Sequence, residues 1–421
     1  MRALIRKKTK LLIFGILATF FSAPGQVYLI SFFIPPMCEE LGLSQTAISG
    51  LFFVGTLSSA FFLPFLGFRL DHERPIRFVT VAGVLLLAGC LFLATAQAPW
   101  MLLAGFFLVR NFGQGGLAMA SQTMMARLKK EHRGQALGIA NLGYPLSESL
   151  LPGLISTVIT VFGWREGWWA LAAMILLIFL PMSRYLIRNE PQPGRAAPDI
   201  REDLNAPDPK DSSWPVSRVM KDRRFHLLLL PILVTPSVLT ALFFHHAAVI
   251  RWKNWDPLLL PAGFVVYAIC RAILSFFSGP LTDRFSARKI FALNLIPLTL
   301  GILFLWLAKN PFWIFFYFAG SGITMGYGMT VGNALYAELY GTRHLGSIRG
   351  MVSTAIVFST ATAPFLMGIC LDAGISLSKI LGVIVFLSSA GIILTYLALK
   401  PERSSLGEIA ARSLGKEEYK Q

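Results

Sequence analysis

The chain consists of long apolar runs separated by short polar breaks. Each run holds roughly 20 residues or more, which is the length that a helix needs to cross about 30 Å of hydrocarbon. The runs are continuous rather than alternating, so they favour helices over membrane-spanning strands. We predict an all-α integral membrane protein with twelve transmembrane helices, near residues 11–37, 46–68, 76–97, 99–126, 134–162, 166–187, 225–250, 258–281, 288–308, 311–337, 347–371 and 377–399.

One break is much longer than the others and divides the helices six plus six. Residues 188–224 hold six prolines and charges of both signs, a composition typical of a solvated linker. We therefore predict four regions: an N-terminal six-helix bundle (1–187), a cytoplasmic linker (188–224), a C-terminal six-helix bundle (225–400) and a cytoplasmic tail (401–421).

The composition indicates that lipid is the solvent. Hydrophobic residues make up 55% of the 421 residues and charged residues only 14%, whereas soluble proteins carry about 25% charged residues. The net charge of +16 could indicate a nucleic-acid partner, but the basic residues lie in the loops. We therefore predict no nucleic-acid partner and a location in the lipid bilayer.

Positive charges are distributed unequally between the two predicted membrane faces. About 31 of the 38 Lys and Arg residues fall on the side of the N-terminus and about five on the other side. This bias predicts a multi-pass protein of a cell (inner) membrane with both termini in the cytoplasm. Seven tryptophans fall at the helix ends assigned to the outer face, as an interfacial belt would: Trp100, Trp164, Trp168, Trp169, Trp252, Trp255 and Trp313.

Several short motifs recur at an offset of about 212 to 216 residues, which predicts that the two halves are parallel copies. The first, Gly67-x-x-x-Asp71, returns as Gly279-x-x-x-Asp283. Glycine lets two helices approach, and a carboxylate at a helix end can pair with cytoplasmic bases or with the N-terminus of a neighbouring helix. We interpret this motif as a latch for one conformation. Alternatively, the two aspartates are solvated turn residues.

At these residues the sequence resembles the major facilitator superfamily. Gly279 to Lys289 matches the loop signature of that superfamily, including Arg284 and Arg288, except that Ser286 replaces a glycine. The copy that begins at Gly67 keeps the glycine, the aspartate and a terminal base, but it lacks the arginine and the second glycine. The resemblance covers essentially the whole chain and implies a secondary transporter with two six-helix bundles, in which the motif residues act as a gate.

Three ionisable residues are predicted near the middle of the membrane. They are Arg110 in the fourth helix, Glu148 in the fifth and Arg271 in the eighth. A mid-membrane arginine costs roughly 2.5–3.5 kcal/mol or more to insert, so it normally faces a cavity or a partner. Together the three carry a net charge of about +1. We predict that Arg271 binds a substrate carboxylate and that Glu148 carries the coupling proton, paired with either Arg110 or Arg271.

The resemblance adds expectations for the two arginines. Arg110 to Gly115 is similar to the Arg-x-x-x-Gln-Gly signature of the fourth helix, which implies either a coupling or packing role or contact with the ligand. Arg271 resembles the eighth-helix arginine of organic-anion carriers such as monocarboxylate transporters and oxalate–formate exchangers. Those carriers place a second base in the first or eleventh helix, and this sequence has none there.

Other polar and aromatic residues could line a cavity between the halves. Ordinary packing between helices is the alternative for any one of them. They are Gln26, Tyr28, Asn141, Tyr144, Tyr267, Tyr327 and Asn333.

No motif of a soluble enzyme is present: the sequence has no nucleotide-binding P-loop, no nucleophile elbow and no metal-spaced His/Cys cluster. Cys38, Cys90, Cys270 and Cys370 are scattered, and the adjacent His245 and His246 point different ways on a helix and would chelate poorly. We therefore expect no catalytic residue, metal or cofactor.

The sequence favours a monomeric transporter that moves a small organic anion, as a carboxylate, together with protons by alternating access. A first alternative is a proton-driven exporter of amphipathic drugs or siderophores, which the aromatic content favours. A second is a non-transporting membrane sensor on the same fold.

Overall fold

A computed structural model describes residues 2–128, 130–190, 214–341 and 344–400. Helices account for most of these residues, and the part described contains no β-strand. The predicted tail and most of the predicted linker lie outside the described residues. The all-α prediction is confirmed.

The helices make twelve membrane crossings. Nine segments of the described chain are long and apolar enough to span a bilayer, and the first, fourth and tenth crossings complete the set. In chain order the crossings are α1 (Arg2–Phe20) with η1 (Ala23–Gly25), α2 (Val27–Ile30) and α3 (Ile34–Leu41); α4 (Gln45–His72); α5 (Pro75–Ala94); α6 (Pro99–Leu108) with η2 (Val109–Leu117) and α7 (Ala118–Ala126); α8 (Lys130–Asn141) with α9 (Gly143–Phe162); α10 (Trp164–Met174) with η3 (Ile175–Phe179) and α11 (Leu180–Ile187); α14 (Arg223–Phe244) with α15 (His246–Lys253); α16 (Leu259–Phe285); α17 (Ala287–Phe291) with α18 (Ile296–Leu307); η4 (Pro311–Trp313) with α19 (Ile314–Tyr340); α20 (Leu345–Asp372); and α21 (Leu377–Leu399).

The first crossing departs most from the predicted continuous helix. It breaks after Phe20, where Pro24 and Gly25 form a short 3-10 turn before α2. Proline lacks the N–H that continues a helix and glycine disfavours it, so the break follows from the local sequence. The seventh crossing also breaks, at His245, between α14 and α15.

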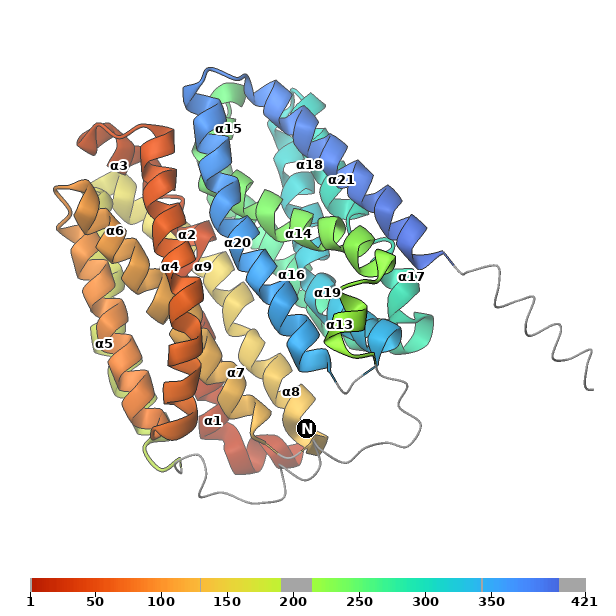
Figure 1. The fold of residues 1–421 in the computed structure, drawn as a ribbon. Coiled ribbons are helices and arrows are strands. Elements are labelled where there is room, and N and C mark those ends of the chain that lie inside the picture. The colour runs from red at the N-terminus through yellow and green to blue at the C-terminus, as the bar shows by residue number, and fades with distance from the viewer. Residues whose placement is uncertain (1, 129, 191–213, 342–343, 401–421) are drawn as a thin grey trace, which may run out of the picture.

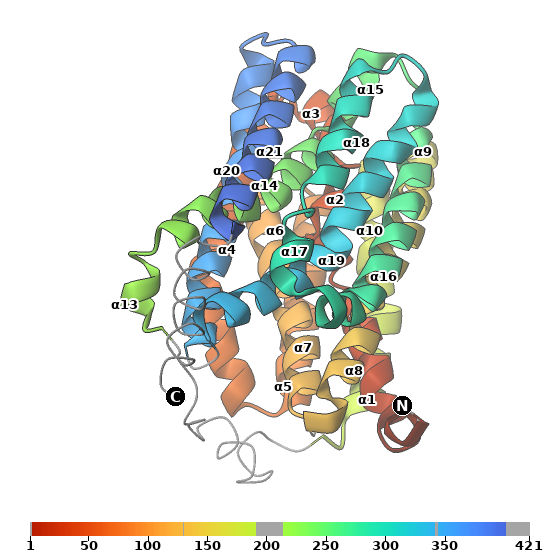
Figure 2. The same ribbon diagram turned by 90° about the vertical axis from the view of Figure 1, so that its right-hand side faces the viewer.

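Figure 1 shows the helices in two groups, which we call the N-terminal half (α1 to α11) and the C-terminal half (α14 to α21); Figure 2 looks onto the second group. The halves meet where α4 packs against α20 and α9 packs against α16, with a smaller contact between α2 and α14. We call the end with the N-terminus and α13 (Val216–Val219) the proximal end, and the end with α3 and α15 the distal end (Figure 1).

Each half contains a crossing where glycine lets two backbones touch. A Cβ atom at Gly143 would lie 2.1 Å from Thr19 Oγ1 and 2.2 Å from the Ile16 carbonyl oxygen on α1. The Thr19 hydroxyl donates a hydrogen bond of 2.6 Å to the Ala140 carbonyl at the same crossing. In the other half, a Cβ atom at Gly326 would lie 2.7 Å from the carbonyl oxygen of Arg271. These contacts fix α9 and α16 within their own halves.

The tryptophans of the predicted belt differ in burial. Trp100 and Trp169 are exposed, whereas Trp164, Trp168 and Trp255 are buried. The buried ones contribute to packing and to polar contacts: Trp164 Nε1 donates to a Glu40 carboxylate oxygen at 2.6 Å, and Trp168 stacks on a phenylalanine ring at 4.2 Å. Position at a helix end therefore predicted the location of these side chains but not their contacts.

Replacing Gly143 by alanine should destabilise the protein by about 1–3 kcal/mol, because the added methyl group would overlap α1. Thermal unfolding of the purified protein in detergent measures this as a lower Tm. Gly153→Ala in the same helix is the matched control, because no atom lies within 4 Å of its added Cβ. Its Tm should be unchanged or higher, and equal Tm values for the two variants would contradict the crossing.

Candidate functional site

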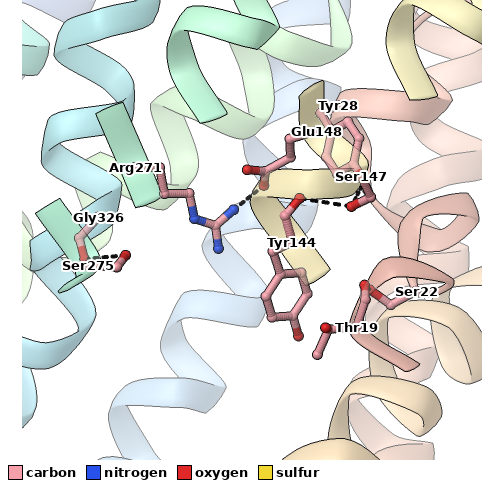
Figure 3. A network of polar contacts seen from close by, with 9 residues as sticks. All are labelled: Thr19, Ser22, Tyr28, Tyr144, Ser147, Glu148, Arg271, Ser275 and Gly326. Atoms are coloured by element: carbon pink, nitrogen blue, oxygen red, sulfur yellow. Dashed lines mark hydrogen bonds and ion pairs between the residues drawn. The ribbon is translucent and has the colours of Figure 1, made fainter. Parts of the chain in front are cut away.

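A buried ion pair joins the two halves at the contact between α9 and α16. Arg271 Nη1 donates a hydrogen bond to Glu148 Oε1 (Figure 3). The Glu148 side chain is 3% exposed and the Arg271 side chain 16% exposed, so the carboxylate is enclosed and the guanidinium retains some access. The structure thus pairs Glu148 with Arg271, one of the two partners expected from the sequence.

Glu148 is held by contacts within the N-terminal half. Its neighbour Ser147 donates from Oγ to the Tyr144 carbonyl at 2.9 Å and accepts a 2.7 Å hydrogen bond from the Tyr28 hydroxyl on α2 (Figure 3). The turn of α9 that carries the carboxylate is therefore tied to the broken first crossing. The second carboxylate oxygen, Glu148 Oε2, is buried and has no hydrogen-bond partner among the described residues. This oxygen is available to a proton or to a donor group.

Arg271 is held by the C-terminal half. The close approach at Gly326 fixes its backbone, and Ser275, one turn further along α16, donates to the Gly326 carbonyl at 2.9 Å. The guanidinium carbon lies 5.3 Å from the centre of the Tyr144 ring, and the Tyr267 hydroxyl also interacts with the Arg271 side chain. Aromatic rings near a guanidinium offer a face that attracts the cation. Two predicted residues, Tyr144 and Tyr267, therefore meet at Arg271.

Arg110 has a different environment. It is 5% exposed inside the N-terminal half, where Nη1 donates to the Gly25 carbonyl at 2.9 Å and the guanidinium lies 5.1 Å from the Phe52 ring. Gly25 lies at the break in the first crossing, so Arg110 satisfies a carbonyl that a continuous helix would have used. The surplus charge expected from three residues is therefore not gathered at one point, and the Glu148–Arg271 pair is formally neutral.

The remaining predicted cavity residues have varied positions. Asn141 is exposed at the end of α8, and Gln26 is half-buried at the start of α2. Tyr327 is buried in an apolar cluster with Leu228 and Phe291 of the C-terminal half. The side chain of Asn333 lies outside the described residues.

In the N-terminal half, the motif carboxylate forms an ion pair at the proximal end. Asp71 Oδ1 lies 3.0 Å from Arg127 Nη2, and Arg127 also donates to the Leu70 carbonyl at 3.3 Å. Asp71 thus pairs with a base at the end of the fourth crossing. Gly67 makes no close approach, because a Cβ atom there would meet only Met119 Sδ at 3.7 Å. The expected role of this glycine in bringing two helices together is not seen.

In the C-terminal half, the corresponding loop is held by Glu338 at the end of α19. Its carboxylate oxygens accept from Ser286 Oγ at 2.9 Å and from the Ala287 backbone N–H at 2.8 Å. Arg288 Nη2 donates to the Glu338 carbonyl at 3.2 Å, while Arg284 lies over the Phe285 ring at 5.3 Å. The surroundings of Gly279 and of the Asp283 side chain lie outside the described part of the chain.

Ser286 occupies the position where the superfamily signature has glycine. Its backbone conformation explains why the signature has glycine there. Its φ of 70° lies in a region that residues with a side chain rarely adopt. Arg127 and Glu338 were not predicted, because they have opposite charges and do not belong to the motifs that recur between the two halves. Both residues bind the motif loop of their own half.

Comparisons with known proteins place this architecture in a family. The sequence profile of the Major Facilitator Superfamily matches residues 16–252 and 248–416, so the chain belongs to this superfamily. Among solved structures, the nucleoside transporter NupG superposes with a TM-score of 0.67 and a mutant of NupG with a TM-score of 0.69. In both cases the sequences are 11% identical, and the match covers 93% of this chain and 98% of the other. The likeness shows a shared fold. None of the curated proteins matches the chain significantly.

We predict that Ser286→Gly raises the stability of the protein while Ser286→Ala lowers it. Glycine removes a backbone strain of about 1–3 kcal/mol, which outweighs the loss of one exposed hydrogen bond worth about 0.5–1.5 kcal/mol. Alanine loses the hydrogen bond and keeps the strain. Thermal unfolding in detergent measures the order, with Ser359→Gly inside α20 as a control that should destabilise. A lower Tm for Ser286→Gly than for Ser286→Ala would contradict this account.

Proposed function

We propose that this superfamily member moves a small organic anion with a single carboxylate, together with protons, by alternating access. The observation that supports the proposal is the buried Glu148–Arg271 pair, which connects a helix of one half to a helix of the other. A transporter that rocks its halves about a midplane site must change the contact between these helices. The two charges are therefore linked to the motion.

Separating the two charges without replacement would be costly. Removing one partner of a buried ion pair destabilises a protein by about 3–5 kcal/mol, because an uncompensated charge remains in a low-dielectric site. A proton on Glu148 and a carboxylate on Arg271 would together remove this cost. The planar guanidinium fork suits a carboxylate, since it can donate two parallel hydrogen bonds. Substrate and proton would thus bind together, which is the requirement for symport.

The charge balance also limits the substrate. Before binding, the pair is neutral; after one proton and one carboxylate bind, the same site is neutral again. A dicarboxylate would add a negative charge with no base to meet it, because Arg110 is engaged with the Gly25 carbonyl. The aromatic rings beside the guanidinium favour an acid with an apolar body. We therefore infer a monocarboxylate.

A neutral polar substrate is the second candidate, favoured by the neutrality of the pair. Such a substrate could accept from Arg271 and donate to the free oxygen of Glu148 without separating the charges. NupG, which shares the fold, is a nucleoside transporter. An exporter of amphipathic cations differs from both, because its cavity would not need Arg271.

Ligand binding should depend on Arg271. In a thermal-shift screen, small monocarboxylates should raise the Tm of the wild type; a ligand at 100 times its Kd stabilises by about 2.7 kcal/mol. Arg271→Ala should abolish the shift, and Arg271→Lys should weaken it, because lysine keeps the charge but loses the fork. Stabilisation by nucleosides instead would favour the neutral substrate. Stabilisation by amphipathic cations that persists in Arg271→Ala would refute the anion carrier.

Proton coupling should depend on Glu148. In proteoliposomes, Glu148→Gln should abolish accumulation driven by a pH gradient while substrate exchange between equal pH values persists, because glutamine mimics the protonated state. Glu39→Gln, at an exposed position on α3, is the control and should accumulate substrate as the wild type does. Gradient-driven accumulation by Glu148→Gln would show that another group carries the proton.

A further inference from the structure

The distal contact between the halves contains a carboxylate that caps a helix of the other half. Asp372 is the last residue of α20, and Gln45 and Thr46 are the first two residues of α4. Asp372 Oδ1 accepts from the Gln45 backbone N–H at 3.2 Å, and Oδ2 accepts from the Thr46 N–H at 2.7 Å. The first N–H groups of a helix have no partner inside the helix and carry its positive dipole end, so a carboxylate is the preferred partner.

The cap of α4 therefore has two parts that come from different halves. Ser44, the residue before the helix, accepts from the Ala47 N–H at 3.1 Å, which is an ordinary cap within one chain segment. Asp372 takes the two N–H groups that Ser44 leaves free. When the halves separate at the distal end, the first part stays in place and the second is lost.

His245 adds another contact at the same place. It lies at the break between α14 and α15, is 2% exposed, and is therefore enclosed although it is near the end of the molecule. Its Nε2 lies 2.9 Å from the Pro364 carbonyl oxygen on α20, and its Nδ1 lies 3.2 Å from Gln45 Oε1 on α4. The ring thus connects the seventh and eleventh crossings to the second.

Close packing surrounds these polar contacts. A Cβ atom at Gly368 would lie 2.4 Å from Ser49 Oγ and 2.7 Å from the Gln45 carbonyl oxygen, so α4 and α20 touch through their backbones. Further along, the rings of Phe53 and Phe365 stack at 5.5 Å. Such a contact can only be made in one register of the two helices.

The described hydrogen bonds between the halves are concentrated at two levels. Besides the Glu148–Arg271 pair, they are those of Asp372 and His245 with the start of α4. At the proximal end, the ion pairs of Asp71 with Arg127 and of Arg288 with Glu338 each stay inside one half. The structure is therefore closed by polar contacts at its distal end.

We propose that Asp372 and His245 form a latch, defined as their contacts with Gln45 and Thr46, which holds the distal end closed. Release of this latch opens the transporter on that side. The Glu148–Arg271 pair responds to substrate, whereas the latch sets how often the distal end opens when no substrate is bound. This assignment is independent of the chemical class of the substrate.

The test measures the distal opening directly. Spin labels at Gln97 and Ser376, exposed positions in distal connections of the two halves, report the distance across that end. The four native cysteines are first replaced by serine or alanine. Electron–electron resonance in lipid nanodiscs without substrate then gives the ratio of open to closed populations. Asp372→Asn should raise this ratio by about 2- to 12-fold, the change expected from the loss of one hydrogen bond, because asparagine keeps only one of the two acceptor oxygens and also loses the negative charge that a helix N-terminus favours.

Asp256→Asn is the matched control. Asp256 also lies in the distal end of the C-terminal half, but its carboxylate accepts from the Leu258 N–H at 2.8 Å within its own turn. This variant should leave the ratio unchanged. An equal shift in both variants would show a general effect of charge and would overturn the latch, as would the absence of a shift in Asp372→Asn.

His245→Ala provides a second, independent variant in case one substitution impairs folding. It should also raise the open population, because it removes the contact with Gln45 while the cap by Asp372 remains. If instead only Glu148→Gln opens the distal end, the central pair holds the closed state and the latch does not. A distal end that stays closed in both His245→Ala and Asp372→Asn would likewise overturn the latch.

Discussion

Hydrocarbon offers no hydrogen bonds, so every polar group within these helices needs a partner inside the protein. This constraint explains the irregular parts of the fold. The first crossing breaks at Pro24, and the freed Gly25 carbonyl receives Arg110 from the fourth crossing. The Thr19 hydroxyl reaches the Ala140 carbonyl next to the break between α8 and α9. At both of these breaks, a polar side chain of another helix reaches a backbone carbonyl, and the contact joins the two helices.

The need for polar partners is met in two ways, by contacts that recur in both halves and by one pair that does not recur. The two halves repeat their motif loops, and each loop is held by a charged residue at the end of a neighbouring crossing, Arg127 in one half and Glu338 in the other. The pair of Glu148 and Arg271 has no such counterpart, since each charge occurs in one half only. The repeated loops belong to the scaffold, while the unique charges carry the proposed selectivity.

Much of the fold could be predicted from the sequence, because hydropathy follows directly from the lipid solvent. The crossings at residues 99–126 and 377–399 begin and end where the pattern placed them. Counting residues along each helix predicted a common level for Arg271 and Glu148, which agrees with their ion pair. Their pairing could only be offered as one of two choices, because the sequence does not fix how helices from different halves face each other.

Other parts of the site depend on contacts that are distant in the chain. Arg110 looked equivalent to Arg271 by depth, yet its partner is a backbone carbonyl, and any residue type supplies one. Asp372 lies just beyond the predicted helix 347–371, and nothing in the local sequence indicated its role. The two N–H groups that it binds are more than 300 residues away in the chain. Ser286 is the informative exception, because its departure from the signature glycine falls at the strained residue of the turn.

The glycine contacts at Gly143 and Gly326 have a mechanical consequence. Gly143 joins α9 to α1 five residues before Glu148, and Gly326 abuts α16 at the backbone of Arg271 itself. Five residues of helix span only about 7.5 Å, so neither charged residue can shift far relative to its own half. A large change in the distance between the backbones of Glu148 and Arg271 therefore requires one half to move relative to the other. The distance between the two charged residues thus reports the movement of the N-terminal half relative to the C-terminal half. A vibrational or fluorescent probe placed beside the ion pair would measure this movement.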